Sequence, residues 1–283
     1  MILYPSFGPG PHVEEVIYSA LSAVYKSDIH PTARGVIFTD NPKPFASVRA
    51  EVVTIDPLTV ESWLGPRRFI YRPKICALAE ALRRFNCPVV MLDGDTFLLR
   101  SPQLLFNRVG PGRAVMHLAE GEIGSLVALG HERHRLSTSR VPTDEGDFQF
   151  RPDWVMWNSG VVGVHPADLQ LVDAALKLSD AMHIATGHKN SEQMAFTEIL
   201  SRNTTLHPCR DVVFHYYQTF IRTPFRARLH QLLTDAMNLP ENQRLAWLYQ
   251  HRPKPPLRKT LAASVKRPLK PFGFFKADLN TSV

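Results

Sequence analysis

Short apolar segments alternate with helical patterns along most of this chain. Apolar runs bounded by polar or turn-forming residues predict strands at residues 2–4, 34–39, 51–55, 89–92, 161–164 and 212–215. Apolar residues recur every three or four positions within residues 13–24, 75–85 and 194–200, which predicts amphipathic helices. Strands that alternate with helices through short connections predict an α/β fold, with a mostly parallel central sheet covered by helices on both faces.

Residues 120–150 break this alternation. They are polar and show no clear period, so they are expected to form a long functional or mobile loop. The sequence His131-Glu132-Arg133-His134 within it resembles a metal motif, but its histidines are three positions apart and not the four of H-E-x-x-H. A polar loop is the better interpretation.

Length and composition set the domain organisation. A chain of 283 residues with 44% hydrophobic content can bury one large core with a small appendage. We expect a main domain at 1–220, a helical segment at 221–250 and a basic, proline-rich tail at 251–283. The N-terminus shows no secretory signal, and no apolar run approaches the roughly 18 residues that span a bilayer. Three widely spaced cysteines, Cys76, Cys87 and Cys209, are expected to be reduced thiols, which favours a cytoplasmic protein.

The net charge of +7 is confined to the tail. Residues 251–283 hold eight of the 33 Lys and Arg residues and one of the 26 acidic residues, so residues 1–250 are balanced. The body carries no basic stripe with interleaved aromatics, which argues against a nucleic-acid partner. In the tail, Phe272, Phe274 and Phe275 lie among the basic residues, a combination that suits the surface of an anionic membrane. A solvated tail is the alternative.

The strongest chemical signal is a pair of aspartates after the apolar run 89–92. Asp93 and Asp95 are separated by Gly94, which lets a ligand approach the backbone. Carboxylates are seldom buried unless they are paired or bind a metal, and two neighbouring ones repel each other unless a divalent cation lies between them. Ligands of open α/β sheets bind at the carboxyl ends of strands. These residues therefore indicate an oxygen-rich metal site, with a solvated Asp-Gly turn as the alternative.

Further candidates follow along the chain. Asn158 and Gly160 precede the strand at 161–164, where Asn158 suits sugar hydroxyls and Gly160 allows close approach to a ligand; an ordinary turn is the alternative. Glu192 and Gln193 open a helix with Asn190 or Ser191 as its N-cap, where a carboxylate also complements the helix dipole. Two cations, Arg72 and Lys74, begin the helix before the aspartates. They suit phosphate groups, or form a solvated helix start.

These residues occur in a recognisable order. Five motifs follow one another along the chain. They are Tyr71-Arg72-x-Lys74, the segment Val-Val-Met-Leu-Asp-Gly-Asp-Thr at 89–96, Trp157-Asn158-Ser159-Gly160-Val161, Glu192-Gln193 and Phe214-His215-Tyr216. The set resembles nucleotide-sugar glycosyltransferases of the GT-A fold, most closely the glycogenin-like and bacterial galactosyltransferase-like group, over roughly residues 1–220. The chain departs from that group at Glu192, where Asp is usual, and after His215, where Gly-x-x-Lys-Pro-Trp is missing.

The resemblance implies a function and roles for residues. It implies transfer of a sugar, with retention, from a nucleoside-diphosphate donor, most often a UDP-sugar, to a glycan, lipid-linked or protein acceptor. Asp93, Asp95 and His215 would bind Mn²⁺ or Mg²⁺, and an imidazole favours Mn²⁺. Glu192 and Gln193 would contact the transferred sugar. The base and ribose would lie against the first loops, whose candidate residues are Tyr4, Ser6 and Asp40.

Two other functions remain open. A haloacid-dehalogenase-like phosphatase also places two carboxylates after a strand, but its D-x-D-x-T pattern requires a Thr where this chain has Phe97. A catalytically silent nucleotide-sugar-binding protein on the same fold is the other alternative. It is disfavoured because both aspartates and His215 are present.

Overall fold

The computed structural model describes residues 1–26, 33–126, 136, 139–144 and 146–255. Residues 1–251 form one compact unit, and residues 252–283 are a separate unit. The predictions for the sequence His131–His134 and for the tail beyond residue 255 fall outside the described residues.

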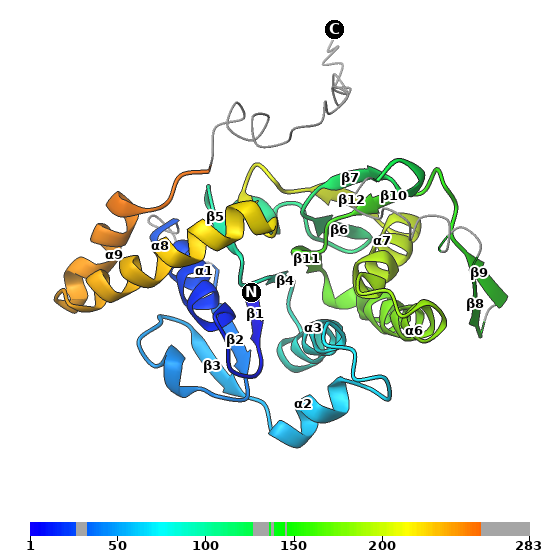
Figure 1. The fold of residues 1–283 in the computed structure, drawn as a ribbon, viewed down its shortest axis with the longest axis horizontal. Coiled ribbons are helices and arrows are strands. Elements are labelled where there is room, and N and C mark those ends of the chain that lie inside the picture. Colours follow the sequence, from blue (N-terminus) through cyan, green and yellow to red (C-terminus); the bar gives the residue numbers. More distant parts are fainter. Residues whose placement is uncertain (27–32, 127–135, 137–138, 145, 256–283) are drawn as a thin grey trace, which may run out of the picture. The chain divides into compact units, whose positions relative to one another are not determined.

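A seven-stranded sheet forms the centre of the compact unit (Figure 1). Its order is β12 (Thr205–Pro208), β6 (Arg113–Met116), β11 (Val161–Val164), β4 (Val89–Leu92), β1 (Ile2–Ser6), β2 (Gly35–Thr39) and β3 (Glu51–Thr54). Strand β11 is antiparallel to both of its neighbours, and all the other pairs are parallel. The predicted α/β class with a mostly parallel sheet is thereby confirmed.

Helices cover both faces of the sheet because its strands bury side chains on both sides. Leu3 and Met91 contact one core cluster, which includes residues of α3 (Arg72–Phe85), α6 (Leu169–Thr186) and α7 (Ser191–Asn203). Their strand neighbours Ile2 and Val90 contact another cluster, which includes residues of α1 (His12–Lys26). Successive side chains of a strand point to opposite faces of the sheet, so neighbouring apolar residues pack against the helices on opposite sides.

Two C-terminal helices belong to the same compact unit as the sheet. Helices α8 (Thr219–Met237) and α9 (Glu241–His251) place Leu229, Leu233 and Leu248 in a cluster with Tyr18 of α1. The cluster also contains residues of a small antiparallel pair, β5 (Thr96–Leu98) and β13 (Val213–His215). Residues 221–250, which were expected to form a separate helical segment, therefore pack on α1. Figure 1 shows α8 running alongside α1.

The region expected to be a loop contains strands, so that prediction is wrong for part of its length. Strand β7 (Ala119–Glu122) pairs with β10 (Val155–Trp157), and β8 (Arg140–Thr143) pairs with β9 (Gly146–Gln149). These strands are three or four residues long and mostly exposed, so they carry none of the apolar alternation that marks a strand in the sequence.

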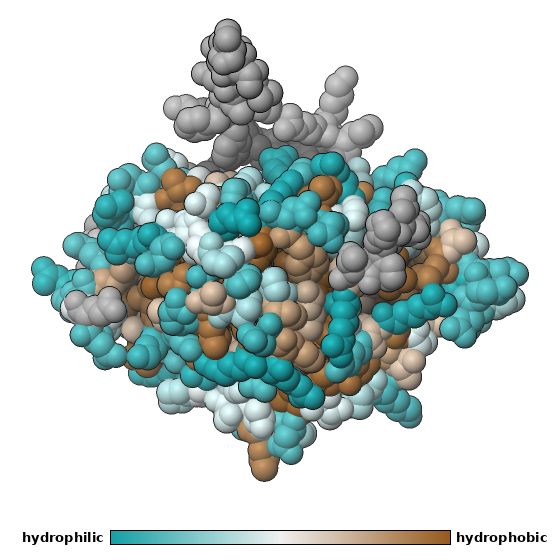
Figure 2. Space-filling model, turned by 180° about the vertical axis from the view of Figure 1, so that it is seen from behind, coloured by the Kyte–Doolittle hydropathy of each residue, from teal (hydrophilic) through white to brown (hydrophobic). Residues whose placement is uncertain are grey.

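The remaining elements are short connections between the layers. They are α2 (Pro57–Trp63), α4 (Gln103–Phe106) and the 3₁₀ turns η1 (Lys43–Phe45), η2 (Ile123–Ser125) and η4 (Pro166–Asp168). On the face drawn in Figure 2, hydrophobic residues are visible between hydrophilic ones. In the described part of the chain, the helices are all too short or too polar to cross a membrane. Cys76, Cys87 and Cys209 are free thiols, as predicted.

Candidate metal and donor site

The site lies at the end of the sheet formed by the carboxyl end of β4 and the amino end of β11. Asp93 directly follows β4, and Gly160 directly precedes the antiparallel β11, so both residues lie at the same edge. The Asp93 amide donates a hydrogen bond to the Gly160 carbonyl at 2.9 Å, which continues the ladder by one residue beyond the strands. The two halves of the candidate site are therefore joined through the backbone.

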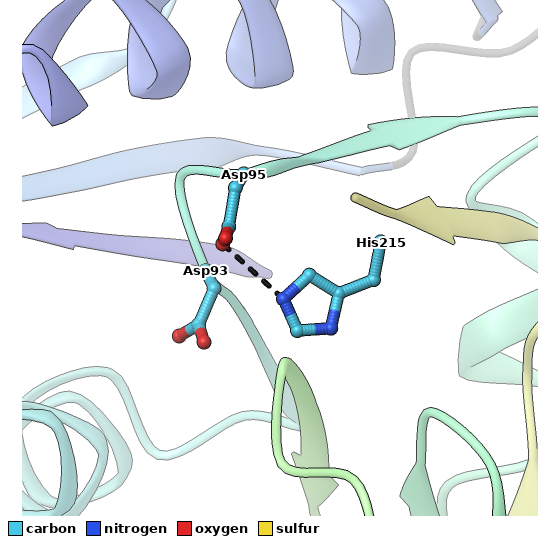
Figure 3. Close-up of side chains that lie close together, drawn as sticks. All are labelled: Asp93, Asp95 and His215. Atoms are coloured by element: carbon cyan, nitrogen blue, oxygen red, sulfur yellow. Dashed lines mark hydrogen bonds and ion pairs between the residues drawn. The ribbon is translucent and has the colours of Figure 1, made fainter. Parts of the chain in front are cut away.

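Three possible metal ligands converge at this edge. One ligand atom from each of Asp93, Asp95 and His215 lies within 4.8 Å of the other two. Figure 3 shows both aspartates leaving the same turn and His215 approaching from β13 with its ring directed at Asp95. The register of β13 on β5, which pairs His215 with Thr96, brings the histidine to the turn.

Two cations already neutralise these carboxylates. Lys74 Nζ lies 2.8 Å from Asp93 Oδ1 and 3.3 Å from Glu192 Oε1. Arg222 Nη1, from α8, lies 2.8 Å from Asp95 Oδ2, and His215 Nε2 lies 3.2 Å from Asp95 Oδ1. Each aspartate therefore has a cationic side chain as a direct partner.

The neighbouring charges decide the ionisation of the site. Burial alone would raise the pKa of Asp95, but His215, Arg222 and Lys74 outweigh burial and lower it to about 2. Burial alone would likewise lower the pKa of Lys74, and Asp93 and Glu192 reverse that effect and raise it. Burial raises the pKa of Glu192, although Lys74 acts in the opposite direction. Asp95 and Lys74 are both charged at neutral pH.

A second group of polar side chains surrounds Glu120 of β7. Its carboxylate accepts hydrogen bonds from Asn158 Nδ2 at 2.9 Å, Gln193 Nε2 at 2.9 Å and the Tyr217 hydroxyl at 3.1 Å. Asn158 Oδ1 in turn lies 2.8 Å from His215 Nδ1. The Glu120 carboxylate thus links the candidate sugar residues Asn158 and Gln193, and Asn158 directly contacts the candidate metal ligand His215.

Arg222 is held in place by a buried acid. Glu15 of α1 is 0% exposed and accepts hydrogen bonds from both Arg222 and Arg226, with N···O distances of 2.6–3.0 Å. A buried carboxylate needs such partners. Since Arg222 contacts both Glu15 and Asp95, α1 and α8 together place a guanidinium at the candidate metal site.

The structure brings together most of the predicted site residues. Grouped around the aspartate turn are Lys74, Asp93, Asp95, Asn158, Gly160, Glu192, Gln193 and His215. The Glu192 carboxylate also accepts a hydrogen bond from the Ser159 hydroxyl at 3.0 Å. Asn190 precedes α7 without a side-chain capping bond, and Ser191 instead donates to the His188 carbonyl.

Tyr4 and Arg72 do not join this group. Tyr4 is 0% exposed and its hydroxyl lies 3.4 Å from the Ser19 carbonyl, so the side chain is a core residue. Arg72 forms a bidentate pair with Asp180 of α6, at 2.7 and 3.1 Å, and ties α3 to α6. Tyr4 was a candidate because it stands at the first loop, and Arg72 because it is a cation at the start of the helix before the aspartates. Packing directs both side chains elsewhere.

Ser6 and Asp40 lie at the ends of β1 and β2. The Asp40 carboxylate accepts the Gly8 amide at 3.0 and 3.1 Å and so orders the loop after β1. The Ser6 hydroxyl is buried and, within the described residues, has no hydrogen-bond partner. Ser6 and Asp40 therefore lie at the carboxyl ends of their strands, at the same end of the sheet as Asp93 and Asp95.

The donor set fits a divalent cation. Two carboxylates and one imidazole are ligands that Mn²⁺ accepts readily, and Mg²⁺ favours the oxygens alone. Gly160 leaves space for the third ligand, since a Cβ on this residue would overlap the His215 ring. Phe97, at the position where a phosphatase pattern needs Thr, is 1% exposed and packs in the core beside Phe225.

Several site residues were not predicted from the sequence. Glu120 fell in the region interpreted as a loop, and Arg222 in the segment assigned to a separate helix. The pair Arg222 and Arg226, spaced by four on one helix face, was a usable signal for an anionic partner. Glu15 gave no signal, because an acid in the first turn of a helix ordinarily complements the dipole.

Comparison with known proteins adds little. No protein-family model matches the chain, and no curated protein matches it in sequence. Among solved structures, it is similar to mouse xyloside xylosyltransferase 1 in its apo form, with a TM-score of 0.47 and 14% identity, covering 74% of this chain and 84% of that chain. A similarity of this size carries no inference about activity, substrate or metal.

Proposed function

We propose that this protein is a metal-dependent glycosyltransferase of the GT-A type that uses a nucleoside-diphosphate sugar as donor. The observation that carries the proposal is the convergence of Asp93, Asp95 and His215 at the carboxyl edge of the sheet, with ligand atoms within 4.8 Å of one another. Ligands of open α/β sheets bind at this edge. The ordered motifs that resemble nucleotide-sugar glycosyltransferases supply the reaction class.

The chain's own residues support the chemistry of glycosyl transfer. A bound Mn²⁺ or Mg²⁺ would supply positive charge that stabilises a diphosphate leaving group. Asp93, Asp95 and His215 would hold it. Lys74 and Arg222 contact Asp93 and Asp95 and place cationic side chains next to the same position.

The sugar would lie against the start of α7. Gln193 is partly exposed and its amide is held by Glu120, while the Glu192 carboxylate is buried between Lys74 and Ser159. Gln193 is therefore the better candidate for direct contact with sugar hydroxyls, and Glu192 for holding Lys74 in place. The base and ribose would occupy the loops that carry Ser6 and Asp40, with uridine as the expected base.

The composition of the tail supports a proposal for the location and the acceptor. Binding of residues 251–283 to an anionic membrane from the cytoplasmic side would suit a lipid-linked or envelope saccharide as acceptor, and a tail that does not bind would favour a soluble glycan or a protein. The basic and aromatic composition of the tail favours the membrane.

A thermal-shift panel of nucleotides and nucleotide sugars, with and without Mn²⁺, tests the proposal. A ligand that binds only the native state raises the melting temperature by mass action. We expect a shift with UDP or a UDP-sugar that requires Mn²⁺ and is lost on chelation, together with slow metal-dependent hydrolysis of the donor. Phosphate release from a simple phosphomonoester, without any response to nucleotide sugars, would contradict the proposal. Binding without hydrolysis or transfer would indicate the catalytically silent protein.

A further inference from the structure

A cavity of about 380 Å³ lies beside the second half of α7. The β8–β9 pair, the segment before β10 and the C-terminal turns of α7 line it, on the side of the compact unit that carries α6 and α7 (Figure 1). Its lining residues do not include the candidate metal ligands Asp93, Asp95 and His215. The cavity is therefore separate from the metal site, and its volume is that of a small-ligand pocket.

Charged side chains of both signs line the cavity in equal numbers. The acids are Asp147 and Glu198, and the bases are Arg151 and Arg202. Arg202 Nη1 donates a hydrogen bond to Glu198 Oε1 at 2.8 Å, and Arg151 Nε lies 3.3 Å from Asp153 Oδ1. Because these charges balance, the cavity does not favour an anion such as a nucleotide or an acidic lipid headgroup. It suits a neutral polar ligand.

The cavity combines an aromatic face with hydrogen-bonding groups. Phe148 of β9 is half-buried, and its ring packs edge to face on Trp154 with the centroids 6.0 Å apart. Beside it lie the buried carboxylate of Glu198, which is 8% exposed, the amide of Gln149 and the hydroxyl of Ser201. A sugar ring presents apolar C–H groups on its faces and hydroxyls around its edge, so this lining matches a saccharide.

Two separate elements connect the cavity with the candidate sugar residues. Along α7, Ser201 follows Gln193 by eight positions, which is about 12 Å of helix. Along β10, Trp154 precedes Asn158 by four positions, which is about 13 Å of strand. Gln193 and Asn158 both donate to Glu120 and so mark one place. The cavity is therefore farther from this place than the length of one sugar ring.

We propose that the cavity binds a distal sugar of the acceptor, so that the acceptor is an oligosaccharide whose reacting end lies near Gln193. The inference rests on the proposed function, because it names the acceptor class of that same enzyme. Helix α7 would contact the transferred sugar at its start and the acceptor chain along its second half. Recognition of a sugar remote from the reacting end selects chains over monosaccharides, since only a chain gains both sets of contacts.

A glycan array probed with the full-length protein tests this inference without metal or sugar donor. The array carries neutral oligosaccharides beside the monosaccharides from which they are built. We expect one or more oligosaccharides to bind. Calorimetric titration with the best tetrasaccharide should give a Kd at least about tenfold lower than that of its terminal monosaccharide.

Three variants remove groups that line the cavity. We expect Phe148→Ala, which removes the aromatic face, and Glu198→Gln, which removes the carboxylate, each to weaken tetrasaccharide binding about tenfold, and Gln149→Ala to weaken it less. The KM of the same tetrasaccharide in Mn²⁺-dependent transfer should rise in parallel. Leu58→Ala and Asn203→Ala, at exposed positions outside the cavity, are the controls. Circular dichroism verifies folding, and the exposed Gln149 remains informative if a more buried variant is unstable.

Two results overturn the inference. One is a wild type that binds no glycan of the array, or that binds the tetrasaccharide no more tightly than the monosaccharide. The other is wild-type affinity in folded Phe148→Ala, Glu198→Gln and Gln149→Ala, which would place the sugar elsewhere. The proposed function is judged separately by the Mn²⁺-dependent response to UDP. Glycan binding without that response would contradict the proposed function and the acceptor role, while the saccharide site would stand.

Discussion

Asp95 combines burial with full ionisation, and its neighbours explain how. It is 5% exposed, yet it contacts an imidazole nitrogen at 3.2 Å and a guanidinium at 2.8 Å. Removing a carboxylate from water is costly unless such partners compensate. Asp93 is less buried and depends on one cation, Lys74. The two aspartates therefore differ in environment although they are two positions apart.

Asp93→Asn and Asp95→Asn should each abolish Mn²⁺-dependent transfer, because an amide is a weaker and uncharged ligand. The fold should persist, since Arg222 keeps Glu15 and Lys74 keeps Glu192 as partners. Activity and calorimetric Mn²⁺ binding are the measurements, and Asp153→Asn at an exposed position is the control. Full activity of Asp95→Asn at saturating Mn²⁺ would refute the metal site.

Gly160→Ala should weaken Mn²⁺ binding at least about tenfold, because the added methyl group would displace the His215 ring. The glycine has no positive φ, so the effect comes from space and not from the backbone. Gly35→Ala is a suitable control, since its Cβ would meet Ala50 Cβ at an ordinary 3.4 Å. Wild-type Mn²⁺ affinity in a folded Gly160→Ala would show that His215 does not bind the metal.

At the scale of elements, α8 completes the site from outside the region covered by the sequence resemblance. It contributes Arg222 and Arg226, and both contact the buried Glu15 of α1. Only Arg222 also contacts Asp95. The two arginines therefore form a natural pair of variants, alike in their structural role and different in their distance from the metal ligands.

Arg222→Met and Arg226→Met should both lower the free energy of unfolding. Removing one partner of a buried ion pair typically costs about 3–5 kcal/mol, and we expect less here because the second arginine stays with Glu15. Urea unfolding measures this loss. Arg222→Met alone should also weaken Mn²⁺-dependent UDP binding, because it removes the cation beside Asp95. Equal UDP affinities in the two variants would argue against a role of Arg222 in donor binding.

The buried face of α3 gives a pH prediction through Cys76. Burial raises the pKa of its thiol from 9.0 to about 11. Between these values the unfolded chain loses the proton while the native protein keeps it, so unfolding becomes more favourable as the pH rises. The stability should fall by up to about 1.4 kcal/mol per pH unit in this window from this group.

Denaturant unfolding between pH 8 and 11 tests this prediction. Cys76→Ala should be less stable near pH 8, because it leaves a small cavity, but its stability should fall less steeply above pH 9. Cys87→Ala, at a less buried position, should follow the wild-type slope. Parallel curves for Cys76→Ala and the wild type would contradict the assignment.

For the whole molecule, the asymmetry of charge is the main feature. The excess of positive charge belongs to residues 251–283, and residues 1–250 are balanced. We expect the full-length protein to sediment with anionic vesicles and not with neutral ones. Each Lys or Arg near an anionic surface contributes about 1 kcal/mol, so binding should weaken as salt is added.

Replacing Phe272, Phe274 and Phe275 by Ser should reduce vesicle binding, while replacing three exposed hydrophobic residues of the compact unit should not. Leu58, Ile70 and Ile184 are suitable controls, at 80%, 72% and 52% exposure. If the wild type does not bind anionic vesicles at low salt, the tail is not a membrane anchor, and a soluble glycan or a protein becomes the favoured acceptor.

The sequence by itself determined the main strands and helices and the candidate residues Asp93, Asp95 and His215. The strands at 89–92 and 161–164 are found with their predicted bounds, because four consecutive buried apolar residues leave little choice of conformation. A mostly parallel sheet covered on both faces follows from the alternation of patterns. That β11 runs antiparallel to β4, which places Gly160 beside Asp93, is known only from the structure.

Only the tertiary structure decided which distant side chains meet. Tyr4 points into the core and Arg72 to Asp180, although each stands two positions from another candidate residue, Ser6 and Lys74 respectively. Glu120 and Arg222 reach the site from segments far from the aspartates in the sequence, and neither local pattern says that its side chain meets them. Local sequence patterns indicate burial and backbone conformation only. The partners of His215 are Asn158, 57 positions away, and Asp95, 120 positions away, and such contacts depend on how the strands and helices pack.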